Sequence, residues 1–317
     1  MKEVNVNTED IIFNSSNHMT LIKGKIFVPQ VKNIKGIIQI SHGMCEHIDR
    51  YEPFIKMLNS NGFIVGIHNH LGHGSSIISD EHKGYFADRF GYKCLIKDLY
   101  SMTKIIKEKF PNVPLILFGH SMGSFITRNY LSEYGKEIDG VILSGTMGPN
   151  PFVDVGIKLC NVLIKQKGPL YRSEKLTDMG LELVFNHSIK HNTTKFDWLS
   201  RDINEVKRYN ADEITDFTFT VSAYKDLLNL IKYANSEKVI QNIPKKLPIF
   251  IMSGDKDPVG NNGEGVEKVY TDMINAGLKN VNMKLYKNGR HEMINEINQE
   301  KVYKDILNWI KNKVLIK

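Results

Sequence analysis

The chain has 317 residues, and its hydrophobic share of 41% and charged share of 24% are ordinary for globular proteins, which excludes a disordered or fibrous chain. Its formal net charge is +7, but the lysines are scattered and no Arg-rich block or aromatic-interleaved basic stripe exists, so we expect no nucleic-acid partner. The three cysteines lie far apart, and neither a signal peptide nor a run of ~20 apolar residues is present, so we expect a cytoplasmic protein in a reducing compartment.

Short β-rich runs alternate with longer amphipathic segments in the first half of the chain. Strands are predicted at residues 21–28, 36–40, 63–67, 115–118 and 141–143. Helices are predicted at residues 51–59 and 92–110, because apolar residues recur there at helical spacing. This alternation indicates a parallel sheet covered by helices, so we expect an α/β fold.

From about residue 149 to 235 the strand pattern stops, and we expect a helical cap insertion. It divides a core made of residues 1–148 and 236–317. The apolar residues that begin this segment share one face of a helix, and a core-facing helix is favoured over a lipid-binding one. These residues are Phe152, Val155, Leu159, Val162 and Leu163.

The strand and helix alternation resumes after Pro244. Strands are predicted at residues 249–252 and 283–286, and helices at residues 266–276 and in a closing segment through Trp309. The sheet is therefore expected to continue after the insertion.

The strongest local signal is an apolar strand that runs into Gly119-His120-Ser121-Met122-Gly123 and then into a helix. A nucleophile on such a sharp turn adopts strained backbone angles, so its neighbours two residues away must be very small, as Gly119 and Gly123 are. Ser121 is therefore the predicted nucleophile. The backbone N–H of Met122, at the positive end of that helix, is a predicted oxyanion donor.

A second oxyanion donor is expected from the loop that follows the strand at residues 37–40. We assign it to the backbone N–H of Met44. His42 in the same loop is predicted to hold the loop by hydrogen bonds, and nothing near Cys45 in sequence marks its thiol as activated.

Three histidines, His68, His70 and His73, cluster after a buried strand. No carboxylate or cysteine stands at ligand spacing beside them, so we interpret them as hydrogen-bonded loop residues. We expect neither a metal nor another cofactor.

A serine hydroxyl needs a base, and the base needs an acid that fixes its tautomer. In an elbow-type hydrolase the order along the chain is Ser, then Asp or Glu, then His. Asp255 and Asp257 both follow the strand near residue 252, and we prefer Asp257 because Pro258 stiffens its part of the loop. His291 follows the next strand and is the predicted base, whereas other histidines lie in the insertion or before the sheet.

Together these motifs resemble the monoacylglycerol lipase and lysophospholipase-like branch of the α/β-hydrolases, which is also grouped with serine aminopeptidase-like hydrolases. The resemblance covers nearly the whole chain. It departs from the family at Asn69 and Leu71, where relatives commonly carry Asp and Arg, and at Cys45, where Gly is common. The residues that carry it are His42-Gly43-Met44-Cys45-Glu46-His47 with Arg50-Tyr51, His70-Leu71-Gly72-His73-Gly74-Ser75, the Ser121 elbow, Gly254-Asp255-Lys256-Asp257 and His291.

The resemblance implies Ser121 as nucleophile, Asp257 as acid and His291 as base, with the Met44 and Met122 amides as the oxyanion hole. It also implies that the insertion forms an apolar acyl pocket above Ser121, and in many relatives this cap touches membranes. We therefore expect hydrolysis of single-chain lipid esters through an acyl-enzyme, monoacylglycerols first and lysophospholipids second. An amidase or aminopeptidase with the same residues is the main alternative, and a non-catalytic binding protein of this fold is the second.

Overall fold

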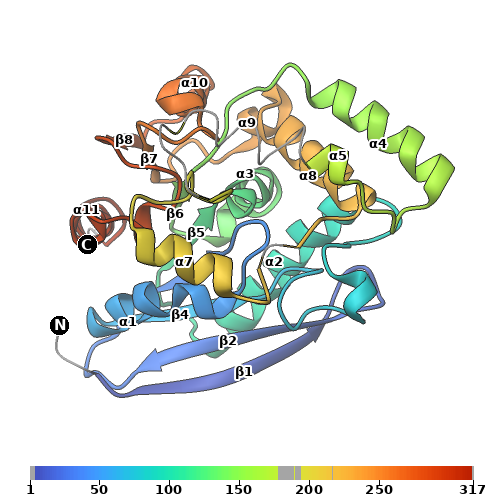
Figure 1. The fold of residues 1–317 in the computed structure, drawn as a ribbon. Coiled ribbons are helices and arrows are strands. Elements are labelled where there is room, and N and C mark those ends of the chain that lie inside the picture. Colours follow the sequence, from blue (N-terminus) through green and yellow to red (C-terminus); the bar gives the residue numbers. More distant parts are fainter. Residues whose placement is uncertain (1–3, 178–188, 190–193, 216, 316–317) are drawn as a thin grey trace.

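The computed structural model describes residues 4–177, 189, 194–215 and 217–315, and an eight-stranded sheet lies at its centre (Figure 1). The strand order is β1-β2-β4-β3-β5-β6-β7-β8, in which β2 pairs antiparallel with β1 and β4 and all other pairs are parallel. The strands are β1 (Val6–Asn14), β2 (Leu21–Pro29), β3 (Gly36–Ser41), β4 (Phe63–His68), β5 (Leu115–His120), β6 (Gly140–Ser144), β7 (Ile249–Gly254) and β8 (Val281–Tyr286).

Helices cover both faces of the sheet. The longer ones are α1 (Glu52–Ser60), α2 (Gly91–Lys109), α3 (Met122–Tyr134), α4 (Val153–Lys167), α7 (Ile203–Ala211), α8 (Val221–Ala234), α10 (Glu264–Asn275) and α11 (Gln299–Trp309). The shorter ones are η1 (Ile48–Tyr51), η2 (Asp80–His82), η3 (Gly135–Glu137), α5 (Glu174–Thr177), α9 (Glu237–Asn242), η5 (Asn261–Gly263), η6 (Met293–Asn295) and the π-helical η7 (Ile310–Val314).

Successive residues of the central strands point to opposite faces, which produces two hydrophobic cores. On β5, Leu115 and Leu117 belong to the core that α2, α3 and α8 cover. Ile116 and Phe118 belong to the second core, which α1 and α11 cover. The fully buried β5 therefore holds the residue that follows it, Ser121, in a rigid position.

The predicted α/β class and the predicted strands are confirmed, and most strands extend one or two residues beyond the predicted ends. Strand β1 was missed. It is an edge strand on which Ile11 alone is buried among nine residues, so the alternation that marks a half-buried strand is absent from its sequence.

The part of residues 149–235 that the structure describes contains helices and no strand, and its role as a cap stays a prediction. Helix α4 lies at the outer edge of the molecule (Figure 1) and packs on α8. The predicted core-facing orientation of α4 is wrong. Val153 and Cys160 form its buried side, whereas Phe152, Val155, Leu159 and Val162 are 75%, 63%, 40% and 51% exposed. No helix among the described residues is long and apolar enough to span a bilayer.

Candidate active site

Ser121 occupies the sharp turn between β5 and α3, as predicted. Its backbone angles are φ 51° and ψ −120°, and a non-glycine residue with positive φ is under strain. The turn is held by a 2.9 Å hydrogen bond from the Ser121 N–H to the Ser144 carbonyl on β6. This conformation places the serine beyond the end of the strand, in a cavity that His291 also lines.

The two elbow glycines are required by close backbone approaches. A Cβ on Gly123 would lie 2.0 Å from the Ser41 carbonyl oxygen at the end of β3. A Cβ on Gly119 would lie 2.7 Å from the Gly123 carbonyl oxygen and 2.4 Å from the Thr127 hydroxyl. Since any side chain here would push α3 away from the sheet, both glycines are needed for the elbow to form.

Asp257 and His291, which follow β7 and β8, meet at the same edge of the sheet. The His291 Nδ1 lies 3.0 Å from both carboxylate oxygens of Asp257. Asp257 also accepts hydrogen bonds from the Ser253 hydroxyl at 2.7 Å and from the Val259 N–H at 2.9 Å. These bonds fix the carboxylate, which in turn fixes the ring and its tautomer.

The competing carboxylate, Asp255, lies elsewhere. It accepts a 2.7 Å hydrogen bond from the backbone N–H of Asn288 in an exposed turn. Of the two aspartates that the sequence offered, the structure therefore pairs Asp257 with His291.

Burial and neighbouring charges set the proton affinity of this pair. Burial alone would lower the pKa of His291, but the charge and hydrogen bond of Asp257, with Glu292 and Glu46 nearby, raise it above the ordinary value. Burial works in the opposite sense on Asp257, and His291 holds the pKa of that carboxyl below its usual range. The arrangement favours an imidazolium next to a carboxylate.

Ser121 and His291 line the same cavity. The buried Nε2 of His291 has no hydrogen-bond partner among the described residues, so the bond between the serine hydroxyl and the ring is not formed in this structure. The free Nε2 is the ring atom that the Asp257 contact leaves available for proton transfer.

The two predicted oxyanion amides flank Ser121. Met122 is the first residue of α3, so its N–H is one of the helix amides without an intrahelical acceptor. Met44 lies in the loop after β3 and lines the cavity with Ser121. In that loop, a Cβ on Gly43 would lie 3.2 Å from the Ser121 Cβ, which shows how closely the loop approaches the serine.

The cavity has an empty volume of about 850 Å³, including its open mouth. Its wall is mostly apolar and comes from α3, α8 and the segment between residues 196 and 217. The apolar lining residues are Phe125, Met147, Phe196, Trp198, Leu199, Phe217, Leu227, Ile231 and Val259.

The loop histidines form hydrogen bonds, as predicted for His42, His70 and His73. The His42 Nε2 accepts from the His70 N–H at 2.9 Å, and the His73 Nε2 accepts from the Cys45 N–H at 3.1 Å. The His70 Nε2 lies 3.0 Å from the Ser41 hydroxyl. These contacts tie the loop that carries Met44 to the loop after β4.

His68 does not follow that prediction. Both of its ring nitrogens are buried without a hydrogen-bond partner in the part of the chain that the structure describes. Within the same residues, no group of three or more His, Cys, Asp or Glu side chains could hold a metal ion.

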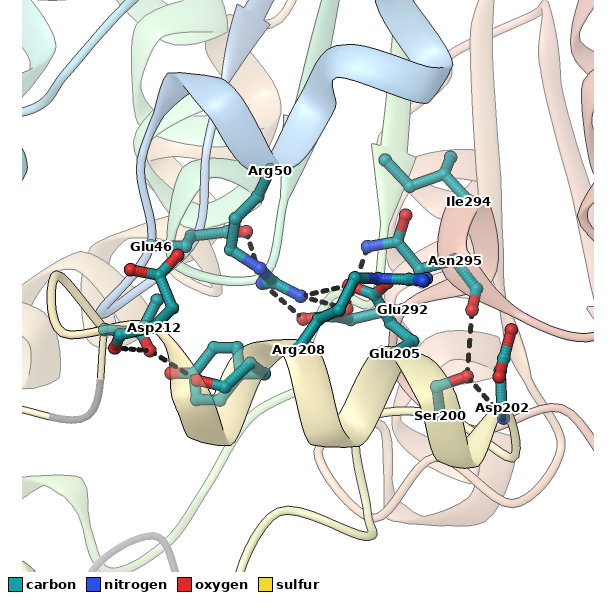
Figure 2. A network of polar contacts seen from close by, with 12 residues as sticks. Glu46, Arg50, Ser200, Asp202, Glu205, Arg208, Asp212, Glu292, Ile294 and Asn295 are labelled. Atoms are coloured by element: carbon teal, nitrogen blue, oxygen red, sulfur yellow. Dashed lines mark hydrogen bonds and ion pairs between the residues drawn. The ribbon is translucent and has the colours of Figure 1, made fainter.

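Sequence reasoning assigned no role to a buried ionic cluster next to this site (Figure 2). Arg50 bonds to Glu46 of the Met44 loop and to Glu292, which directly follows His291. Glu46 and Arg50 belong to one of the sequence motifs that carry the family resemblance, so this motif could have indicated a role for them. Trp198, whose ring centroid lies 5.0 Å from that of His291, had none.

A mostly parallel sheet with this elbow and this Asp–His edge defines the class: the protein is a hydrolase of the α/β-hydrolase fold. Within that class, residues 32–298 match the family described as serine aminopeptidase, S33 (Hydrolase_4), and the chain belongs to this family.

Individual relatives are similar over most of the chain. It is 28% identical over 283 residues to a monoglyceride lipase homolog of monkeypox virus, covering 88% of this chain and 91% of that protein. It is 25% identical over 288 residues to a monoacylglycerol lipase of Mycolicibacterium smegmatis, covering 87% of this chain and 88% of that protein. A solved carboxyl esterase from Bacillus coagulans is 28% identical with a TM-score of 0.91, over 98% of this chain and 100% of that chain.

Proposed function

We propose that this protein hydrolyses carboxylic esters of single-chain lipids, with monoacylglycerols as the first substrate class. The observation that carries the proposal is the apolar cavity that opens on both Ser121 and His291. Its size and lining suit one acyl chain, because ligand pockets of this kind are mostly apolar with a few polar groups at the reacting end. The similarity to monoacylglycerol lipases supports the same substrate class.

In the proposed mechanism, the His291 Nε2 removes the Ser121 proton while the serine oxygen attacks the ester carbonyl carbon. The carbonyl oxygen becomes an oxyanion that accepts hydrogen bonds from the Met44 and Met122 amides. The His291 proton passes to the departing alcohol, which leaves an acyl-enzyme. Water, deprotonated by His291, then attacks the acyl carbon; as the acyl–serine bond breaks, His291 returns the proton to the Ser121 oxygen and the fatty acid is released. Asp257 stabilises the imidazolium in both steps.

The charges around the cavity favour an uncharged head group. Two carboxylates, Glu46 and Glu292, line it, and among the described lining residues there is no lysine or arginine. Both carboxylates are ion-paired with Arg50, which does not line the cavity, so a phosphodiester would find no lysine or arginine available among the described residues beside Ser121. This ranks monoacylglycerols ahead of lysophospholipids.

The exposed apolar residues of α4 give the proposed substrate a route from a lipid surface. Phe152, the N-cap residue of α4, and Val155 and Val162 on the helix are exposed, and the helix also carries Lys158 and Lys165. Apolar side chains with nearby lysines are typical of helices that lie on anionic bilayers. We propose that α4 contacts the membrane that supplies the substrate.

The decisive variant is Ser121→Ala. We expect it to lower kcat on a monoacylglycerol by at least ~10³-fold and to abolish labelling by a fluorophosphonate, because the nucleophile is gone. Ser60→Ala, on the outer helix α1, serves as the matched control and should keep the parental rate. Parental turnover by Ser121→Ala would refute the proposal.

The amidase alternative is tested on the same protein. Turnover of a monoacylglycerol, a lysophosphatidylcholine and an aminoacyl amide should fall in that order. Faster cleavage of the amide than of either ester would favour the aminopeptidase function instead.

A further inference from the structure

Arg50, at the end of η1, is buried in an ionic cluster beside the proposed active site (Figure 2). Its side chain is only 6% exposed. One guanidinium nitrogen donates to Glu46 at 2.9 Å and to Glu292 at 2.8 Å, and the other donates to Glu292 and Glu205, both at 2.8 Å. We call Arg50 and these three glutamates the Arg50 cluster.

Two carboxylates of the Arg50 cluster belong to the loops that carry the chemistry. Glu46 also accepts from the backbone N–H of Gly43, the residue before Met44, and from the Tyr51 hydroxyl at 2.9 Å. Glu292 is covalently next to His291. The planar fork of Arg50 therefore fixes the distance between the Met44 loop and the histidine loop.

The third carboxylate comes from helix α7. Glu205 lies on α7, which faces η1 and α1 across the Arg50 cluster (Figure 2). From the same helix, the Tyr209 ring lies 4.6 Å under the Arg50 guanidinium, and its hydroxyl donates to the Cys45 carbonyl at 3.1 Å. Helix α7 thus touches both the arginine and the Met44 loop.

A second attachment joins the segment before α7 to the histidine loop. The Glu292 N–H donates to the Leu199 carbonyl at 2.8 Å, and the Ser200 hydroxyl donates to the Asn295 carbonyl at 2.9 Å. Arg201 forms a 3.0 Å ion pair with the fully buried Glu296. The chain that follows His291 is therefore held from the segment that leads into α7.

We propose that Glu205 is a positioning residue for the reaction: by engaging Arg50 from α7, it locks the Met44 loop and the His291 loop into their reactive spacing. The lock is effective because the cluster is buried and charged. An arginine that lost one of its three carboxylates there would shift toward the other two and carry their loops with it. Catalytic groups displaced by about 1 Å lose rate on the order of a hundredfold.

The test compares Glu205→Ala, Glu205→Gln and Glu213→Ala, and it rests on the ester hydrolysis proposed above. We expect Glu205→Ala to lower kcat on a monoacylglycerol by roughly ten- to a hundredfold with KM changed less than about threefold. Glu205→Gln keeps an oxygen that can accept from Arg50, so it should recover most of kcat. Glu213→Ala, which removes an exposed carboxylate after α7, is the control and should match the parent.

The possible results distinguish a failure of the positioning role from a failure of the proposed hydrolase function. All rates are measured at least 15 °C below the thermal midpoint of each variant, so that lost stability alone does not lower kcat. If the parent turns over ester and Glu205→Ala keeps kcat within twofold, or if Glu205→Gln is no faster than Glu205→Ala, the positioning role is refuted while the hydrolase function stands. A parent that reacts with neither ester nor fluorophosphonate refutes the proposed function and this inference with it.

Discussion

At the residue scale, the proposed mechanism makes the reactivity of Ser121 depend on how strongly His291 holds its proton. Because Asp257 outweighs burial and raises the pKa of His291, the ring stays protonated to a higher pH than a free histidine does. A protonated ring cannot act as a base. We therefore expect kcat/KM of the parent to rise with pH through a midpoint above 6.5, the ordinary value for histidine.

The variant Asp257→Asn reverses that balance. Burial, which lowers the pKa of His291, then acts unopposed by this carboxylate, so the acid midpoint of kcat/KM should move downward while the maximal rate falls by on the order of 10⁴. The measurement is a pH profile of ester hydrolysis for each protein. Asp255→Asn is the control, and an equal loss in that variant would show that the acid has been misassigned.

Much of the candidate site could be predicted from the sequence because its constraints are local. The glycines around Ser121 are dictated by backbone approaches within a few ångströms, and they leave a readable motif. Glu205 and Trp198 could not be predicted. Their roles depend on contacts with Arg50 and His291, which lie about 90 or more residues away along the chain, and no local pattern encodes such a contact.

At the element scale, the buried strands were readable and the outer elements were not. Strands buried on both faces are continuous apolar runs, which can be recognised in the sequence. The pairing of the edge strand β1 and the orientation of helix α4 depend instead on the elements around them. An apolar helix face has the same periodicity whether it packs on a core or faces solvent. The orientation of α4 was therefore wrong although the face itself was correct.

The exposed face of α4 makes a prediction about lipid surfaces. The double variant Phe152→Ser, Val155→Ser removes the two most exposed apolar side chains of that face, each of which would gain about 1.5 kcal/mol or more on burial in a bilayer. We expect binding to anionic vesicles, measured by sedimentation, to fall by roughly a hundredfold. Hydrolysis of vesicle-borne monoacylglycerol should fall in parallel.

Two comparisons make that result specific. Turnover of a short-chain soluble ester should stay unchanged in the double variant, because the cavity is not altered. Ile12→Ser removes an equally exposed apolar side chain from β1 and should leave vesicle binding at the parental level. Loss of binding in both proteins would mean that α4 has no special part in it.

At the scale of the whole molecule, the parallel sheet gathers the functional groups at one edge. Ser121 follows β5, Asp257 follows β7, His291 follows β8 and Met44 follows β3. The carboxyl ends of parallel strands lie together, so residues spread over most of the chain meet without long connections. The same packing also buries several histidines that take no direct part in the proposed chemistry.

These buried histidines make the folded state sensitive to acid. Burial lowers the pKa of each, to about 3 for His68 and His120 and to about 4 for His73. Below pH 6.5 each of these histidines binds a proton in the unfolded chain but not in the folded chain. The free energy of unfolding therefore decreases as the pH is lowered, by ~1.4 kcal/mol per pH unit for each group. The raised pKa of His291 and that of Asp226, which burial raises to about 7, act in the opposite direction and offset part of this loss. The histidines concerned are His42, His68, His70, His73 and His120.

We therefore expect the free energy of unfolding in urea to drop by roughly 4 kcal/mol between pH 7.5 and pH 5.5, a large part of the stability of a typical domain. His68→Leu should reduce this slope by the share of one proton, because neither ring nitrogen of His68 has a partner among the described residues and none is orphaned by the change. A slope in His68→Leu equal to that of the parent would show that His68 is protonated in the folded protein, with its charge in a buried site 4.9 Å from the ring centre of His70.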